Sequence, residues 1–161
     1  MKTLRELHDT LPQQGRVDWI AVRPARGIAM QVVPQVRVDP AAGLDGDRYA
    51  GSSGHRHLSL LQAEHLPVIA GVLGVQAIDP ALLRRNFLIS GINVLALKQK
   101  IVRIGAVLVE VTGACHPCSR METQLGAGGY NAMRGHGGVT ARLLEAGTIR
   151  VGDRVEFVRR A

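Results

Sequence analysis

The two cysteines of the chain lie close together, in the segment Cys115-His116-Pro117-Cys118. This segment follows a predicted strand and precedes a predicted helix. A thiol at the start of a helix lies near unpaired backbone amides, which favour the thiolate, the form that attacks electrophiles and binds metals. The neighbouring cations, His116 and Arg120, would act in the same direction. The segment therefore predicts a reactive or metal-binding thiol.

Three other interpretations of the pair remain open. A thioredoxin-like thiol-disulfide oxidoreductase would use both Cys115 and Cys118, although the preceding chain lacks the βαβ pattern of that fold. A structural zinc site would need four ligands, and the spacing does not indicate that His55, His57 or His136 completes the set. Two buried, unreactive cysteines are also common, but the polar, glycine-rich flanks disfavour burial here.

Two further segments carry polar side chains that suit a ligand. The glycine-rich loop over residues 42–54 lets a ligand approach the backbone, and Asp47, Arg48 and Arg56 would supply polar contacts. The segment Arg84-Arg85-Asn86 could hold an anion and the edge of a heterocycle. The alternative for its two arginines is a pair that only balances a helix dipole.

The basic residues indicate an anionic ligand. The net charge is +7, and 17 of the 20 basic residues are arginines, whose planar guanidinium matches phosphate and carboxylate. An arginine-rich solvated surface is the equally open alternative. Nucleic acid is not expected as a partner, because the basic residues are scattered and aromatic residues make up only 3% of the chain.

The chain has 161 residues, of which 46% are hydrophobic, enough for one domain with a buried core. No apolar run reaches the ~18 residues that span a bilayer, so no membrane association is expected. The N-terminus lacks a signal-peptide core, and two cysteines are too few for a disulfide scaffold. The sequence therefore predicts a cytoplasmic protein.

Many short strands without a βαβ rhythm predict an α+β, mostly β, barrel-like domain over residues 15–160. Residues 1–14 are predicted to form an N-terminal helix or arm, because Thr3-Leu4-Arg5-Glu6 resembles a capping box. Residues 126–138, rich in glycine, are predicted to be a long loop. The expected strands are 17–22, 30–38 with a break at Pro34, 58–61, 86–89, 100–104, 106–112 ended by Gly113, 139–144 and 154–158, and the expected helices are 62–73, a short one opened by Asp79-Pro80, and 115–125.

Taken in order, these segments resemble the MOSC family, named for the C-terminal domain of molybdenum-cofactor sulfurase, from about Val17 to Val158. Each segment is weak evidence alone, but their common order is specific. The matching segments are Gly43-Leu44-Asp45-Gly46-Asp47-Arg48, Arg56-His57-Leu58-Ser59-Leu60-Leu61, Arg84-Arg85-Asn86 with Gly91, Ile104-Gly105-Ala106-Val107-Leu108, Pro117-Cys118-Ser119-Arg120 and Gly147-Thr148-Ile149-Arg150-Val151-Gly152-Asp153.

The resemblance implies a MOSC-like β-barrel with a few peripheral helices and a pocket for the pterin molybdenum cofactor, molybdopterin. It implies that Cys118 is the catalytic cysteine, which ligates molybdenum or carries a persulfide. Cys115 lies outside the family pattern, so no role is carried onto it. The cofactor-binding residues expected around the pocket are Arg56, His57, Arg84, Asn86 and Arg120.

The expected function is reduction of N-hydroxylated small-molecule substrates, with electrons from a separate flavin or iron–sulfur protein. The alternative is a sulfur or cofactor carrier that uses a Cys118 persulfide. The chain resembles no pyridoxal-phosphate module and has only three lysines, Lys2, Lys98 and Lys100. It is therefore not expected to use pyridoxal phosphate itself, and any sulfur would come from a sulfur donor protein.

Overall fold

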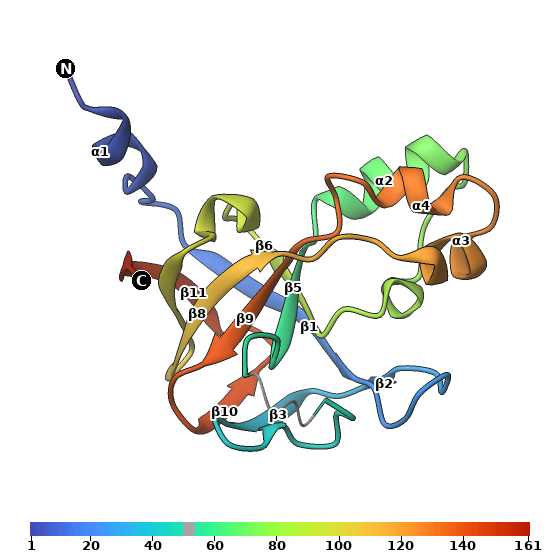
Figure 1. Cartoon of the computed structure of the whole chain (residues 1–161), viewed down its shortest axis with the longest axis horizontal. Helices are drawn as coiled ribbons and strands as arrows, with labels where there is room; N and C mark the ends of the chain where they lie inside the picture. The colour runs from blue at the N-terminus through green and yellow to red at the C-terminus, as the bar shows by residue number, and fades with distance from the viewer. Residues whose placement is uncertain (50–53) are drawn as a thin grey trace.

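A barrel of short strands forms the centre of the protein, whose computed structural model describes residues 1–49 and 54–161 (Figure 1). Over these residues seven strands close the barrel, and its last strand pairs back to its first. These strands are β1 (Gly15–Val22), β6 (Phe87–Ser90), β5 (Leu58–Gln62), β9 (Val139–Leu143), β8 (Val107–Ala114), β7 (Lys100–Ile104) and β11 (Arg154–Arg160), in their order around the barrel. The predicted α+β, mostly β, barrel is confirmed.

The barrel is mixed, because β5 and β6 run parallel while the other neighbouring pairs are antiparallel. The short strand β2 (Gln31–Val32) extends the sheet from β1. A separate small sheet has the order β10 (Gly147–Arg150), β3 (Gln35–Asp39) and β4 (Gly43–Leu44). The gap between β2 and β3 confirms the predicted break at Pro34, which has no N–H to donate to a ladder.

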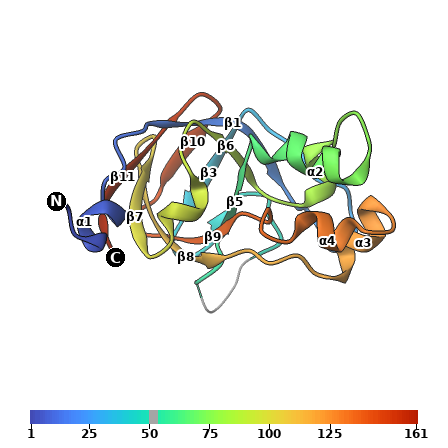
Figure 2. The ribbon, with the colours of Figure 1, turned by 90° about the horizontal axis from the view of Figure 1, so that it is seen from above.

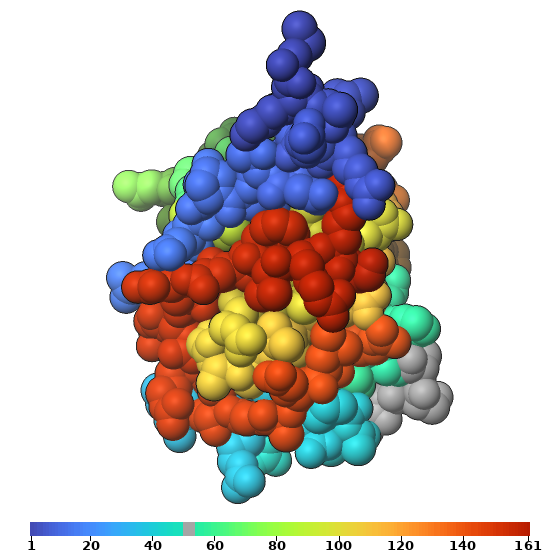
Figure 3. All heavy atoms as spheres, turned by 90° about the vertical axis from the view of Figure 1, so that its left-hand side faces the viewer, coloured from blue at the N-terminus to red at the C-terminus, as the bar shows by residue number. Residues whose placement is uncertain are grey.

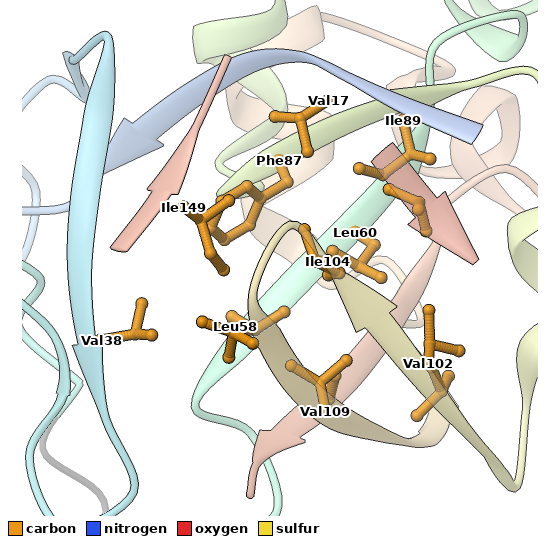
Figure 4. Packing of buried hydrophobic residues seen from close by; sticks show 14 of the residues in the cluster. Val17, Val38, Leu58, Leu60, Phe87, Ile89, Val102, Ile104, Val109 and Ile149 are labelled. Carbon is orange, nitrogen blue, oxygen red and sulfur yellow. The ribbon is translucent and has the colours of Figure 1, made fainter. Parts of the chain in front are cut away.

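Alternate residues of the strands fill the interior of the barrel, as the period of two requires. Val107, Val109 and Val111 of β8 are all fully buried, which confirms the alternation predicted there. Figure 4 shows their neighbours from the other strands, including Leu60 and Phe87, pointing toward one another inside the barrel. This core holds the strand ends in place, and the functional side chains project from those ends.

Three helices pack together at one end of the barrel: α2 (His65–Leu73), α3 (Ser119–Leu125) and α4 (Gly129–Met133) (Figure 2). A second apolar cluster, which includes Leu61, Leu83 and Met121, joins them to the strands. Two 3-10 turns, η1 (Pro80–Leu83) and η2 (Val94–Leu97), precede β6 and β7. No helix among the described residues is long and apolar enough to cross a membrane.

The N-terminal helix α1 (Leu4–His8) lies at the opposite end, beside the C-terminal strand (Figure 3). It has the predicted capping box, in which Thr3 and Glu6 exchange side-chain to backbone hydrogen bonds. Arg160 ties the segment to β11, because its Nε donates to Asp9 at 2.6 Å and its Nη2 donates to the Arg5 carbonyl at 3.2 Å.

Several predicted elements are corrected by the structure. The strand over 106–112 does not end at Gly113, because β8 continues to Ala114 across a register shift between Val111 and Gly113. The helix predicted from Cys115 begins only at Ser119. The later start has a physical reason, because Pro117 disfavours helical dihedrals in the residue before it.

The predicted loop over 126–138 contains α4, and the strand β10 was not predicted. The Glu122 carboxylate organises the start of α4 by accepting hydrogen bonds from the Gly128 and Tyr130 amides at 2.8 and 2.9 Å. Capping by a side chain six to eight residues earlier leaves no periodic pattern in a glycine-rich sequence. The strand β10 depends in the same way on its partner β3, which lies more than a hundred residues earlier in the chain.

Gly138 offers a test of how closely the strands approach one another. Its φ is +78°, and an added Cβ would lie 2.0 Å from the Leu60 carbonyl oxygen. We expect Gly138→Ala to lower the free energy of unfolding by about 2 kcal/mol or more, because it adds both a strained φ and a backbone clash. The matched control is Gly71→Ala in α2, where an added Cβ meets nothing within 4 Å. Urea denaturation should show that the control is unchanged or stabilised by ~0.5–1 kcal/mol, and equal midpoints for the two variants would contradict this account.

Candidate functional site

Arg84 is a buried cation with unsatisfied donors. It follows η1 with a left-handed φ of 57°, and its residue is only 9% exposed. Its Nη1 donates to the Ile28 carbonyl at 2.8 Å, whereas Nε and Nη2 are buried and have no hydrogen-bond partner within residues 1–49 and 54–161. Each unsatisfied buried donor costs ~1–3 kcal/mol. An anion bound beside Arg84 would remove that cost, so the residue is a candidate anion-binding residue.

The surroundings of Arg84 are strongly positive. Burial lowers the pKa of Arg84, and the charges of Arg120, Arg23 and Arg48 lower it further, while Asp47 opposes the shift. Three neighbouring arginines therefore act on Arg84, against one carboxylate. A negative ligand would be attracted to this region and would reverse the direction of those effects.

The Asp47 side chain is fully buried, and its carboxylate opposes this shift. It forms an ion pair with Arg23 at 3.2 Å and accepts a second bond from the Arg23 backbone amide at 2.7 Å. The Tyr49 amide and the Asn86 side-chain amide donate to it at 3.2 and 3.3 Å. Because Asp47 is committed to Arg23, it leaves Arg84 and Arg120 without a carboxylate partner among the described residues.

The buried side chain of Asn86 connects several segments of the site through hydrogen bonds. Its side chain is fully buried, and its Oδ1 accepts hydrogen bonds from the Ser59 amide and hydroxyl, both at 3.1 Å. Its Nδ2 donates to the Ala21 carbonyl at 3.1 Å as well as to Asp47. Asn86 therefore positions Ser59 and Asp47, and through them the ends of β5 and β1.

A cavity of about 180 Å³ lies among these residues, the volume of about six water molecules at ~30 Å³ each. Arg85 contributes to its wall but is occupied with the backbone, because its guanidinium donates to the carbonyls of Gly137 and Leu83 at 2.8 Å and of Cys115 at 3.3 Å. The lining residues are Arg23, Tyr49, Arg56, Leu58, Ser59, Arg84, Arg85, Cys115 and Thr140.

A more open groove of about 400 Å³ also contains Arg84 in its lining. The turn that follows β1 and the start of α3 form its walls. Arg84 therefore contributes to two hollows, a small cavity and a wider groove. The groove residues are Arg26, Gly27, Arg84, Ser119, Arg120, Thr123 and Gln124.

The predicted site residues are distributed over both hollows. The structure brings Arg56 and Arg84 together in the cavity, and Arg84 and Arg120 together in the groove. Asn86 and His57 are in neither lining. His57 is buried, and its Nδ1 accepts a hydrogen bond from the Leu143 amide at 2.9 Å. Burial, and then the charge of Arg142, lower the pKa of His57.

The two cysteines have different environments. Cys115 is half-buried and lines the cavity, whereas Cys118 is exposed and lies in neither lining. Cys118 is the residue directly before α3, next to Ser119 of the groove. Within the described part of the chain, no three His, Cys, Asp or Glu side chains gather closely enough to hold a metal ion.

Sequence reasoning missed Arg23, Ser59 and Cys115 as residues of the cavity. Arg23 follows the first predicted strand directly, and a charged residue at the end of a buried strand was the available signal. Cys115 lies outside the family pattern, so the resemblance implied no role for it. The sequence did not indicate that Ser59 would line the cavity, because the position of Ser59 depends on its hydrogen bonds with Asn86.

The fold and the site together define a β-barrel protein with several arginines around a cavity and a groove. The model of the MOSC domain matches residues 45–156, which is more than two thirds of the chain. The chain belongs to the MOSC domain family.

Solved structures support the same fold. The YuaD protein from Bacillus subtilis is similar with a TM-score of 0.78 and 17% identity, over 94% of this chain and 100% of that one. YiiM from Geobacillus stearothermophilus has a TM-score of 0.73 and 20% identity, over 89% of this chain and 75% of its own. YiiM from Escherichia coli has a TM-score of 0.69 and 19% identity, over 91% and 71%. A comparison with curated protein sequences gives no significant match.

Asp47 is the residue to change for a test of the site's construction. We expect Asp47→Asn to lower the free energy of unfolding by about 2 kcal/mol, because it removes the buried charge that accepts hydrogen bonds from Arg23 and the Asn86 amide, while the partly exposed Arg23 guanidinium keeps access to water. Asp45→Asn, at an exposed position two residues away, should stay within ~0.5 kcal/mol of the wild type. Chemical denaturation measures both, and an Asp47→Asn protein as stable as its control would show that the ion pair is not structural.

Proposed function

We propose that the protein binds the pterin molybdenum cofactor at this site and reduces N-hydroxylated small molecules. The observation that carries the proposal is the buried Arg84, whose Nε and Nη2 have no partner among the described residues and which lines a cavity in a MOSC barrel. The phosphate of the cofactor is an anion of the kind that such donors bind. Electrons would come from a separate flavin or iron–sulfur protein.

The residues present fit this cofactor. Arg84 and Arg56 would hold its phosphate, and Arg23 would add positive charge while remaining paired with Asp47. Asn86 and His57, which do not line the cavity, would hold the backbone around it through hydrogen bonds. When bound, molybdenum supplies oxygen-atom and electron transfer, chemistry that amino-acid side chains do not provide.

Cys118 is the proposed protein ligand of the metal. Its thiol is exposed, at the residue before α3, and is therefore free to meet a bound group. Thiolates are suited to such a metal because they are soft ligands. Arg120, two residues further along the chain, would contribute positive charge to the same region.

The second candidate function is that of a sulfur or cofactor carrier. The exposure of Cys118 favours it, because a persulfide must be accessible to the protein that supplies or takes the sulfur. A sulfur donor protein would then be the partner, and the chain would use no pyridoxal phosphate of its own. The proposal has no role for nucleic acid or a membrane and assigns the protein to the cytoplasm, which the absence of a disulfide scaffold favours.

The thioredoxin-like alternative receives less support. The chain folds as a closed barrel, without the βαβ core in which that redox motif is found. The two thiols also differ in their surroundings, since only Cys115 lines the cavity.

The cofactor proposal is tested by the metal content of purified protein. We expect wild-type protein made in a cofactor-competent host to contain molybdenum and pterin, and Arg84→Gln to lose at least tenfold of both, because it removes the charge that faces the phosphate. Arg150→Gln is the matched control, an exposed arginine on β10. Elemental and pterin analysis provide the measurement, and wild-type protein without molybdenum would overturn the proposal.

The roles of the two cysteines are tested together. We expect Cys118→Ala to abolish cofactor-dependent reduction and persulfide labelling, whereas Cys115→Ala keeps most of both, since one thiolate suffices as a metal ligand. The assay compares substrate reduction, bound molybdenum and sulfane sulfur in one host. Equal loss in both variants would favour a dithiol mechanism, because a redox pair fails when either thiol is removed.

A further inference from the structure

A hydrogen bond and a glycine turn shape one wall of the groove beside Arg84. Arg84 Nη1 donates to the Ile28 carbonyl at 2.8 Å, which fixes the turn that carries Arg26 and Gly27. Gly27 has a φ of +76°, so the turn adopts a conformation that L-residues avoid, and its missing side chain leaves the wall open. The same arginine thus shapes one wall of the groove and contributes to its lining.

The other wall is one face of α3. Ser119 and Thr123 are four residues apart, as are Arg120 and Gln124, so the four side chains share a face of the helix. Met121 is 2% exposed and packs in the apolar cluster between the helices and the barrel. The helix therefore presents hydroxyl, amide and guanidinium groups to the groove.

The lining of the groove is positively charged. Its lining contains three arginines, Arg26, Arg84 and Arg120, and no carboxylate from the described residues. The nearest acid on α3, Glu122, is committed to α4 through hydrogen bonds from the Gly128 and Tyr130 amides. A groove with this lining favours a carboxylate or a phosphate, which accepts bidentate hydrogen bonds from arginine.

We infer that the groove binds an anionic group, a carboxylate or phosphate, carried by the N-hydroxylated substrate. The inference rests on the proposed function, because it assigns the smaller cavity to the cofactor phosphate and the groove to the substrate. Cys118, the proposed metal ligand, directly precedes Ser119 of the groove. A substrate that reaches the metal would therefore lie along the groove, with its anionic end near Arg26 and Arg120.

The test uses the cofactor-loaded enzyme and two probe substrates that differ in one charge: benzamidoxime, which is neutral, and 4-carboxybenzamidoxime. We expect wild-type enzyme to prefer the carboxylate, and Arg26→Gln to lower the ratio of kcat/KM for the charged over the neutral probe by about tenfold. Arg150→Gln, which removes the same charge on β10, should leave the ratio unchanged. An unchanged ratio in Arg26→Gln would overturn the inference.

Two further measurements separate this inference from the proposed function. Molybdenum and pterin content should be the same in Arg26→Gln and wild type, and a loss of both would assign the groove to the cofactor instead of the substrate. Calorimetry on cofactor-free protein should show binding of 4-carboxybenzamidoxime that weakens in Arg26→Gln, with no binding of the neutral probe. If wild-type protein holds no molybdenum, the proposed function fails, whereas the calorimetric difference still decides whether the groove binds anions.

Discussion

The buried carboxylate of Asp47 is the contact on which the site depends. It is held by the Arg23 guanidinium and amide, the Tyr49 amide and the Asn86 side chain, which come from three separate parts of the chain. A buried charge is tolerated only when such donors surround it. Asp47 therefore joins the end of β1, the loop after β4 and the start of β6. The same bonds commit its charge to Arg23, and this leaves the neighbouring arginines available to a ligand.

The positive charge of Arg84 lowers the stability of the folded protein. Arg84 has a left-handed φ, little exposure and two donors without partners among the described residues, and each of these features lowers stability. The apolar interior of the closed barrel offsets this cost, because its packing stabilises the strands as a whole. Local strain and unsatisfied donors of this kind are retained where a ligand relieves them, as at preorganised anion sites.

Much of the fold could be predicted from local patterns. Val107, Val109 and Val111 alternate as a half-exposed strand must, and Pro34 interrupts a strand because it has no N–H. The parts that could not be predicted depend on contacts that no local periodicity encodes. The helix α4 relies on the Glu122 carboxylate, and β10 relies on pairing with β3. Neither contact leaves a periodic signal in a glycine-rich segment.

The sequence by itself determined the family and the β-rich class, because ordered motifs and hydrophobic spacing are properties of the chain read in one direction. Only the tertiary structure decided which side chains face a common space. In the folded chain Asn86 and His57 are buried and hydrogen-bonded around the site. Arg23 and Cys115 line the cavity. The physical reason is that closure of the barrel, through the pairing of β1 with β11 and the parallel contact of β5 with β6, sets the distances between residues far apart in the chain.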